Sequence, residues 1–161
     1  MLDLIIRNGK CYIDGELKEV DVAIKDKKIH QIGQISEEAK ETIDASGHTV
    51  LPGCIDTQTH FREPGSTDTE DLHTGSRAAI AGGITSVFEM PNTNPPTSNK
   101  KEFQRKLDLA KNRMYCNYAF YFGATADNAD DLASLKDLEG CCGIKLFAGS
   151  STGNLLVAEE D

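Results

Sequence analysis

The 161-residue sequence has no excess of basic residues, no long apolar run and no regularly spaced cysteine pair. It holds 17 Lys and Arg against 26 Asp and Glu, a net charge of −9, which suits neither nucleic acid nor an anionic bilayer. No apolar stretch approaches the roughly 18 residues that span a membrane. The N-terminus also lacks the basic and apolar segments of a secretory signal. We therefore expect a protein that binds neither nucleic acid nor membranes.

The five cysteines are odd in number, and no two of them form a Cys-x-x-Cys motif. A disulfide framework is therefore not expected, and reduced thiols in a cytoplasmic protein fit better. The adjacent Cys141 and Cys142 could be mistaken for a redox pair. We interpret them as small buried side chains beside a strand, because free cysteine is among the residue types most often buried.

The sequence changes in character near residue 50. Residues 1–49 combine short apolar strands with turn signals such as Asn8-Gly9 and Asp14-Gly15, which predicts a small antiparallel, half-exposed sheet. Residues 50–161 alternate apolar runs with helical patterns, which is typical of a parallel α/β sheet. The runs cover 50–57, 85–90, 115–122 and 143–147, and the helical patterns cover 69–81, 98–114 and 127–135.

Four β/α units fit either an open doubly wound sheet or part of a closed barrel. A complete (β/α)8 barrel takes about 250 residues. Residues 50–161 would then hold about its first half, and we expect the chain to be truncated.

A dense polar cluster directly follows the first apolar run. Alternate side chains of a strand point to the same face, about 6.6 Å apart. We expect four side chains to share one face in this way: Asp56, Gln58, His60 and Arg62. In a barrel that face is the interior, and active sites lie at its carboxyl end. A metal ion or an anionic substrate would supply the partners that such groups need. The alternative is a strand end that frays into solvent.

Two further segments carry candidate chemistry. Lys145, within GIKLF, is predicted to point opposite its apolar neighbours, where burial would lower its pKa and leave a nucleophilic amine. Reaction with carbon dioxide would give a carbamate able to bridge two metal ions; the alternative is a lysine that reaches solvent at an edge strand. The proline-rich segment 90–96 would hold Asn92 or Asn94 over the strand ends, unless it is an ordinary connecting loop.

The sequence also contains a glycine-rich segment and three further histidines. Residues 149–153 form a loop that could cradle an anion or close on substrate, although they do not match the P-loop pattern. The remaining histidines are expected to be structural or solvated: His30, His48 and His73.

Four motifs of the sequence belong together: DLIIRNG, LPGCIDTQTHFREPG, GGITSVFEMPNTNPPT and GIKLFAGSSTG. They resemble those of the cyclic amidohydrolases, and within these the longer, class I dihydroorotases. The HFREPG and MPNTNP blocks are the specific ones, because they separate dihydroorotases from hydantoinases and allantoinases. The resemblance implies a (β/α)8 TIM-barrel amidohydrolase fold with a small β-sandwich. Residues 1–49 would be the N-terminal part of the sandwich, and residues 50–161 the first four β/α units of the barrel.

The resemblance also implies a metal site with one or two zinc ions. His60 would be a zinc ligand, and Lys145 the carboxylated lysine that bridges the metals. Arg62 and Asn92 would bind the substrate carboxylate, and Asp56 would act catalytically by orienting the site. In the family, two further histidines and a general-base aspartate come from later strands, outside these 161 residues.

One position departs from the family pattern. Gln58 stands where the family usually has a histidine metal ligand, and an amide suits zinc less well than an imidazole. The implied activity is reversible hydrolysis of dihydroorotate to N-carbamoyl-L-aspartate in pyrimidine biosynthesis. The alternatives are an inactive dihydroorotase-like subunit that scaffolds aspartate carbamoyltransferase, and an allantoinase- or hydantoinase-type cyclic amidase. We also expect a homo-oligomer.

Overall fold

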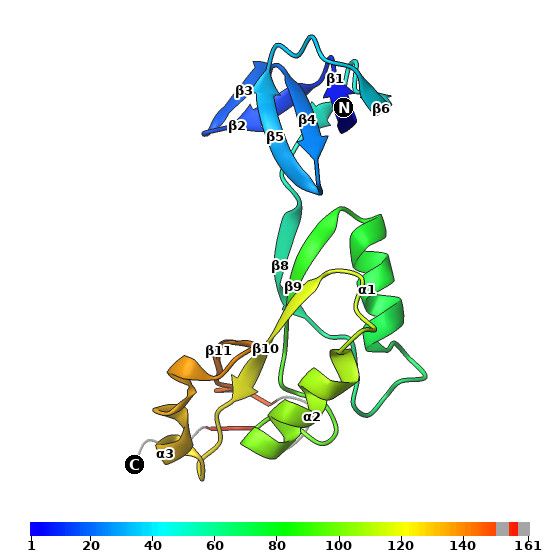
Figure 1. The fold of residues 1–161 in the computed structure, drawn as a ribbon. Coiled ribbons are helices and arrows are strands. Elements are labelled where there is room, and N and C mark those ends of the chain that lie inside the picture. Colours follow the sequence, from blue (N-terminus) through cyan, green and yellow to red (C-terminus); the bar gives the residue numbers. More distant parts are fainter. Residues whose placement is uncertain (151–154, 158–161) are drawn as a thin grey trace. The chain divides into compact units, whose positions relative to one another are not determined.

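The computed structural model describes residues 1–150 and 155–157 (Figure 1). The chain divides into two compact units, Met1–Pro52 and Gly53–Asp161. Within the described residues, no helix is both long enough and apolar enough to cross a membrane.

The first unit contains two small sheets, with strand orders β5-β4-β1-β6 and β3-β2-β7. Its strands are β1 (Leu2–Arg7), β2 (Lys10–Ile13), β3 (Glu16–Glu19), β4 (Asp21–Lys25), β5 (Lys28–Gly33), β6 (Ala39–Asp44) and β7 (Thr49–Val50). A core of four buried side chains holds it together: Leu2, Ile5, Ala23 and Ile35.

The prediction of a wholly antiparallel sheet for this unit is wrong. The hairpins β2–β3 and β4–β5 are antiparallel, but β1 pairs with β6, and β2 with β7, in parallel. The sequence pattern missed β6 because nearly all of its side chains are exposed, so it has no buried alternation to detect.

The second unit is built on a parallel sheet with the strand order β11-β10-β9-β8. Its strands are β8 (Cys54–Thr59), β9 (Ile84–Glu89), β10 (Asn117–Gly123) and β11 (Cys141–Lys145). The helices are α1 (Leu72–Ala81), α2 (Lys100–Ala110), the short α3 (Ala129–Leu132) and the 3-10 turn η1 (Leu135–Asp137). Neighbouring strands are consecutive in sequence, which is the arrangement of β/α units along part of a barrel wall.

Helices α1 and α2 begin at side-chain caps. Asp71 caps α1 by accepting the Thr74 backbone N–H in a capping box, so the helix starts later than the predicted residue 69. Asn99, rather than the predicted Ser98, caps α2. Both predictions placed the start too early, because a polar residue ahead of a helix is a cap only if its oxygen reaches the first-turn N–H groups.

Both helices pack on one face of the sheet through an aromatic core (Figure 1). Phe103 of α2 lies 6.4 Å from Phe120 and 6.1 Å from Phe122, measured between ring centroids. Phe61, which follows β8, packs against Gly75 of α1, where an added Cβ would lie only 2.4 Å from its ring. The close approach of Phe61 to α1 therefore depends on a glycine in the helix.

Candidate functional site

The carboxyl ends of β8 and β9 bring His60 and Asn92 together. The Met90 N–H donates to the Thr59 carbonyl at 2.9 Å, so the two strand ends remain in register where the loops begin. Beyond this point the His60 and Asn92 side chains share a hydrogen bond. Thr93 and Thr97 both donate their backbone N–H groups to the Pro91 carbonyl at 2.9 Å, which folds the proline-rich loop that carries Asn92.

Positive charge surrounds His60. Partial burial, together with the charges of Arg62, Lys106 and Lys145, lowers the pKa of His60 below its ordinary value, against the opposing effect of its hydrogen bond with Asn92. A lowered pKa keeps the imidazole neutral at pH 7, with a ring nitrogen free to accept a hydrogen bond or bind a metal ion. The same charges favour an anionic group beside the ring.

Asp56 and Gln58 are arranged differently from the prediction. The pairing of β8 with β9 shifts between Asp56 and Thr59, so that the regular alternation of faces is interrupted there. The Asp56 carboxylate accepts the backbone N–H of Gln58 at 2.9 Å. In the described part of the chain, Asp56 is therefore hydrogen-bonded to Gln58 rather than to His60, and the Gln58 side chain is exposed.

Lys145 ends β11, opposite Gly123 of β10, at one edge of the sheet. Its Nζ lies 5.0 Å from the centroid of the Phe147 ring, a cation–π contact. The side chain is half-buried in the described residues, and its charge lowers the pKa of His60; burial inside a complete barrel stays a prediction. The neighbouring Cys141 and Cys142 are free thiols and are only partly buried.

The described residues do not form a complete zinc site. Over residues 1–150 and 155–157, no three His, Cys, Asp or Glu side chains lie close enough together to hold a metal ion. Among the described residues, His60 supplies the imidazole at these strand ends, while Gln58 offers only an amide. Carboxylation of Lys145 stays a prediction. The predicted loop at residues 149–153 lies mostly outside the described residues.

A buried ion pair behind the site was missed from the sequence. Glu89, at the end of β9, pairs with Lys106 of α2, and both side chains are fully buried. The Glu89 Oε1 accepts the Phe61 N–H at 3.2 Å, and Lys106 donates to the Met90 carbonyl at 3.0 Å. Burial raises the pKa of Glu89 to about 7. The sequence does contain a sign of this pair, because Lys106 lies on the same buried face of α2 as Phe103 and Ala110.

A second ion pair holds the loop after His60. Glu63 is buried and forms a bidentate pair with Arg113, with oxygen–nitrogen distances of 2.7 and 3.1 Å. Its Oε2 also accepts the Leu72 N–H of α1 at 2.9 Å. The carboxylate raises the pKa of Arg113 above its ordinary value. Arg62 lies between the buried Phe61 and the buried Glu63. It is exposed and has a φ of 59°, in the left-handed region.

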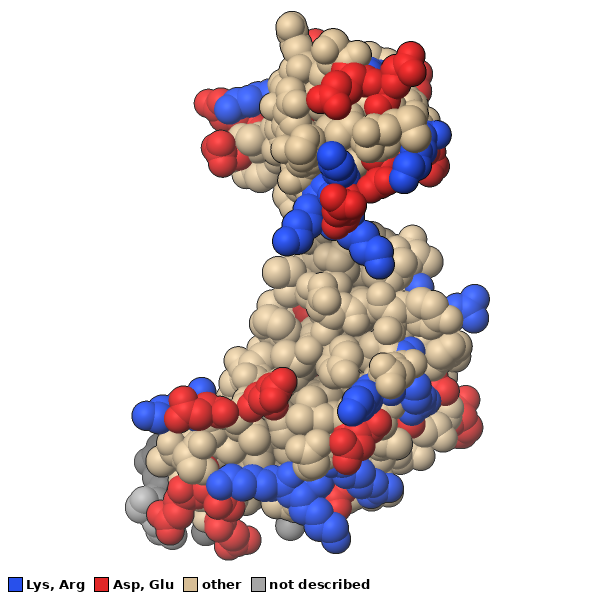
Figure 2. Space-filling view, viewed as in Figure 1, with Lys and Arg blue, Asp and Glu red and all other residues tan. Residues whose placement is uncertain are grey.

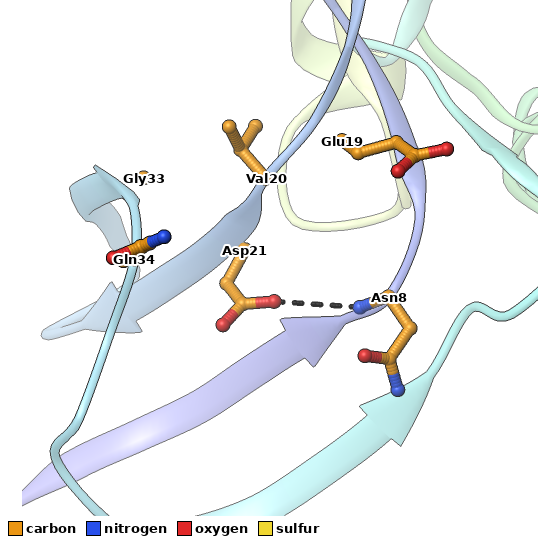
Figure 3. Close-up of a pocket in the computed structure, with 6 residues that line it drawn as sticks. All are labelled: Asn8, Glu19, Val20, Asp21, Gly33 and Gln34. Carbon is orange, nitrogen blue, oxygen red and sulfur yellow. Dashed lines mark hydrogen bonds between the residues drawn. The ribbon is translucent and has the colours of Figure 1, made fainter.

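Other surface features of the described residues lie away from the predicted site residues. Figure 3 shows a pocket of about 310 Å³ in the first unit, lined in part by Asn8, Asp21 and Gln34. Asp21 accepts the Asn8 N–H at 3.3 Å and pairs with Arg7, so its carboxylate is already bound. On the face of the second unit seen in Figure 2, charged side chains lie around the margin of a largely uncharged surface.

The sequence profile described as "Amidohydrolase family" matches residues 49–146. The chain belongs to the amidohydrolase family. It is 42% identical over 149 residues to an allantoinase of Escherichia coli O1:K1, covering 92% of this chain and 33% of that protein. The chain therefore spans about a third of the length of the curated amidohydrolases that it matches.

Solved amidohydrolase structures share the fold. The L-hydantoinase (dihydropyrimidinase) from Arthrobacter aurescens superimposes with a TM-score of 0.86 at 30% identity, over 99% of this chain and 36% of its own. The dihydropyrimidinase from Brevibacillus agri gives a TM-score of 0.81 at 27% identity, over 98% and 35%. The resemblance to the cyclic amidohydrolases, with a parallel sheet that forms part of the barrel, is confirmed. The narrower assignment to dihydroorotase stays a prediction.

Proposed function

We propose that this protein hydrolyses the ring amide of a cyclic ureide, a ring in which a carbonyl group lies between two N–H groups. The observation that supports this best is the pairing of His60 with Asn92 at two neighbouring strand ends, with the positive charges of Arg62 and Lys145 beside it. The allantoinase and hydantoinase relatives are named for two such rings, allantoin and hydantoin.

Each of these side chains has a distinct role in the proposal. Neutral His60 offers a ring nitrogen to the reacting centre, and Asn92 fixes the orientation of its ring. Arg62 and Lys145 stabilise negative charge on the bound ring or on the carbonyl oxygen during attack. Amidohydrolases typically bind metal ions, but the described residues do not form such a site alone. The roles proposed for these four side chains are therefore to bind the substrate ring and to orient it.

A second candidate substrate is dihydroorotate, which carries a carboxylate on a six-membered ureide ring. The exposed guanidinium of Arg62 next to His60 favours it, because a guanidinium can bind a carboxylate through two parallel hydrogen bonds. The site would then need the planar fork of Arg62, which a lysine cannot reproduce.

The test compares rings with and without the carboxylate, using the full-length protein with zinc supplied. Dihydroorotate and dihydrouracil differ only in that group, and allantoin and hydantoin extend the neutral series. Hydrolysis of the neutral rings supports an allantoinase- or hydantoinase-type activity, whereas preference for dihydroorotate supports the second candidate. His60→Asn should abolish either activity while the protein stays folded.

A folded protein that hydrolyses none of the four rings would contradict the proposal. An authentic allantoinase and an authentic dihydroorotase must be active in the same assay for this result to count. The outcome would favour the inactive scaffold subunit, for which Gln58 in place of a histidine ligand is the supporting feature. Activity that appears only after Gln58→His would support the same conclusion.

A further inference from the structure

Arg62 lies between two residues whose side chains are anchored in the protein. On one side, the Phe61 ring is buried against Gly75, and the Phe61 N–H donates to Glu89. On the other side, the Glu63 carboxylate is buried against Arg113. The Arg62 side chain is left exposed, two residues after His60.

The backbone of Arg62 adopts a conformation that an L-residue avoids. Its φ of 59° is in the left-handed region, which costs free energy for residues other than glycine. Such a conformation persists only where the surrounding structure over-determines it, and it is found most often at functional sites. Contacts made by the residues around Arg62 must therefore hold the loop in place.

Arg113 provides the most extensive of these contacts. Besides its two bonds to Glu63, it donates to the Leu109 carbonyl of α2 at 3.1 Å and lies 3.6 Å from the Asp71 carboxylate that caps α1. Glu63 in turn accepts the first N–H of α1, from Leu72. The pair thus joins the loop to the start of one helix and the end of the other.

We propose that Glu63 and Arg113 are positioning residues that hold Arg62 in its left-handed conformation, and that they thereby set the preference of the site for ring substrates with a negatively charged substituent. This rests on the proposed function, and within it on the second candidate, a ring that carries a carboxylate. Neither residue touches the ring. The pair acts through the loop, and Arg62 makes the contact.

The test is a double-mutant cycle in the full-length protein. We compare wild type, Arg62→Gln, Arg113→Gln and the double variant by the ratio of kcat/KM for dihydroorotate to that for dihydrouracil. Loss of a charged hydrogen bond corresponds to about a tenfold change or more, so Arg113→Gln and Arg62→Gln should each lower the ratio by that factor. The double variant should lower it no further.

Two variants control for structural damage. Arg105→Gln removes an exposed ion pair with Glu102 on α2 and should leave the ratio unchanged. Arg113→Lys keeps the positive charge but loses the planar guanidinium that makes two bonds to Glu63. The ratio of kcat/KM for the two rings should therefore fall part of the way, which tests the inference even if Arg113→Gln does not fold. A purely structural role for Arg113 would lower kcat/KM for both rings equally and leave their ratio intact.

A readout without turnover separates this inference from the proposed function. Calorimetry measures binding of orotate, which carries the carboxylate, and of uracil, which lacks it, to the same variants. If wild type hydrolyses none of the four rings, the proposed function fails, while weaker orotate binding in Arg113→Gln still supports the positioning role. The inference is overturned if folded Arg113 variants keep the wild-type selectivity, if the two substitutions act additively, or if wild type does not prefer the charged ring.

Discussion

Replacement of Lys106 by methionine should strongly destabilise the second unit. The substitution keeps a similar volume but removes the cation that pairs with Glu89, in a place where both side chains are fully buried. Where the remaining carboxylate is charged, breaking a buried pair by removing one partner costs about 3–5 kcal/mol, because an uncompensated charge is left behind. The lost bond to the Met90 carbonyl adds to this cost.

The destabilisation should depend on pH in a defined direction. The pKa of Glu89 is raised from 4.5 to about 7 by burial, and the attraction of Lys106 lowers it, so without Lys106 it must rise further. A carboxyl whose folded-state pKa is raised stabilises the fold fully below the unfolded pKa, and this contribution is lost as pH rises through the folded pKa. The Lys106→Met penalty should therefore be smallest below pH 4.5 and should grow as pH rises past about 7.

Urea unfolding of the full-length protein followed by circular dichroism, at several pH values, measures both effects. The matched control is Lys101→Met, an exposed lysine of the same helix, which should change the free energy of unfolding by less than about 0.5 kcal/mol. The double variant Glu89→Gln/Lys106→Met should recover much of the loss, because neutral partners of similar shape are tolerated. A Lys106→Met penalty below about 1 kcal/mol, or a double variant as unstable as the single one, would refute the buried-charge argument.

Three further outcomes are expected. Gly75→Ala should cost about 1–3 kcal/mol in urea unfolding, because its methyl group would meet the Phe61 ring; an unchanged midpoint would show that the ring can move aside. Asp71→Ala should cost about 1 kcal/mol through loss of the α1 cap, and Asp71→Asn should restore most of it in the same assay. Dialysis of the full-length protein against a chelator should abolish ring hydrolysis, and added zinc should restore it; activity that survives complete metal removal, checked by elemental analysis, would exclude the expected metal dependence.

The four parallel strands were predictable because each is a short apolar run bounded by turn residues. Their ends were not. The predicted run over 50–57 divides at Pro52-Gly53, since Val50 pairs with Cys11 in the first unit while β8 begins at Cys54. A pattern of apolar residues shows that a strand is present, but its partner is chosen by contacts distant in sequence.

The candidate site was predictable only in part. The motifs placed His60 and Asn92 at the strand ends without predicting the hydrogen bond between them, and they placed Asp56 on the face of His60 by assuming an uninterrupted strand. The register shift in β8 breaks that assumption. The ion pairs of Glu89 and Glu63 join residues that are 17 and 50 positions apart, and no local periodicity can reveal such partners.

The parallel pairings of the first unit have a consequence for the order of folding during synthesis. Leu2 lies opposite Ala39, and Lys10 opposite Thr49, so the earliest strands must wait for the latest ones before their sheets can close. The hairpins β2–β3 and β4–β5 can form early on the ribosome, but β1 lacks one neighbour until residue 44 has emerged, and β2 lacks one until residue 50 has emerged. Because distant pairings form slowly, a shortened chain that ends before Thr49 should expose the unpaired edge of β2 and aggregate.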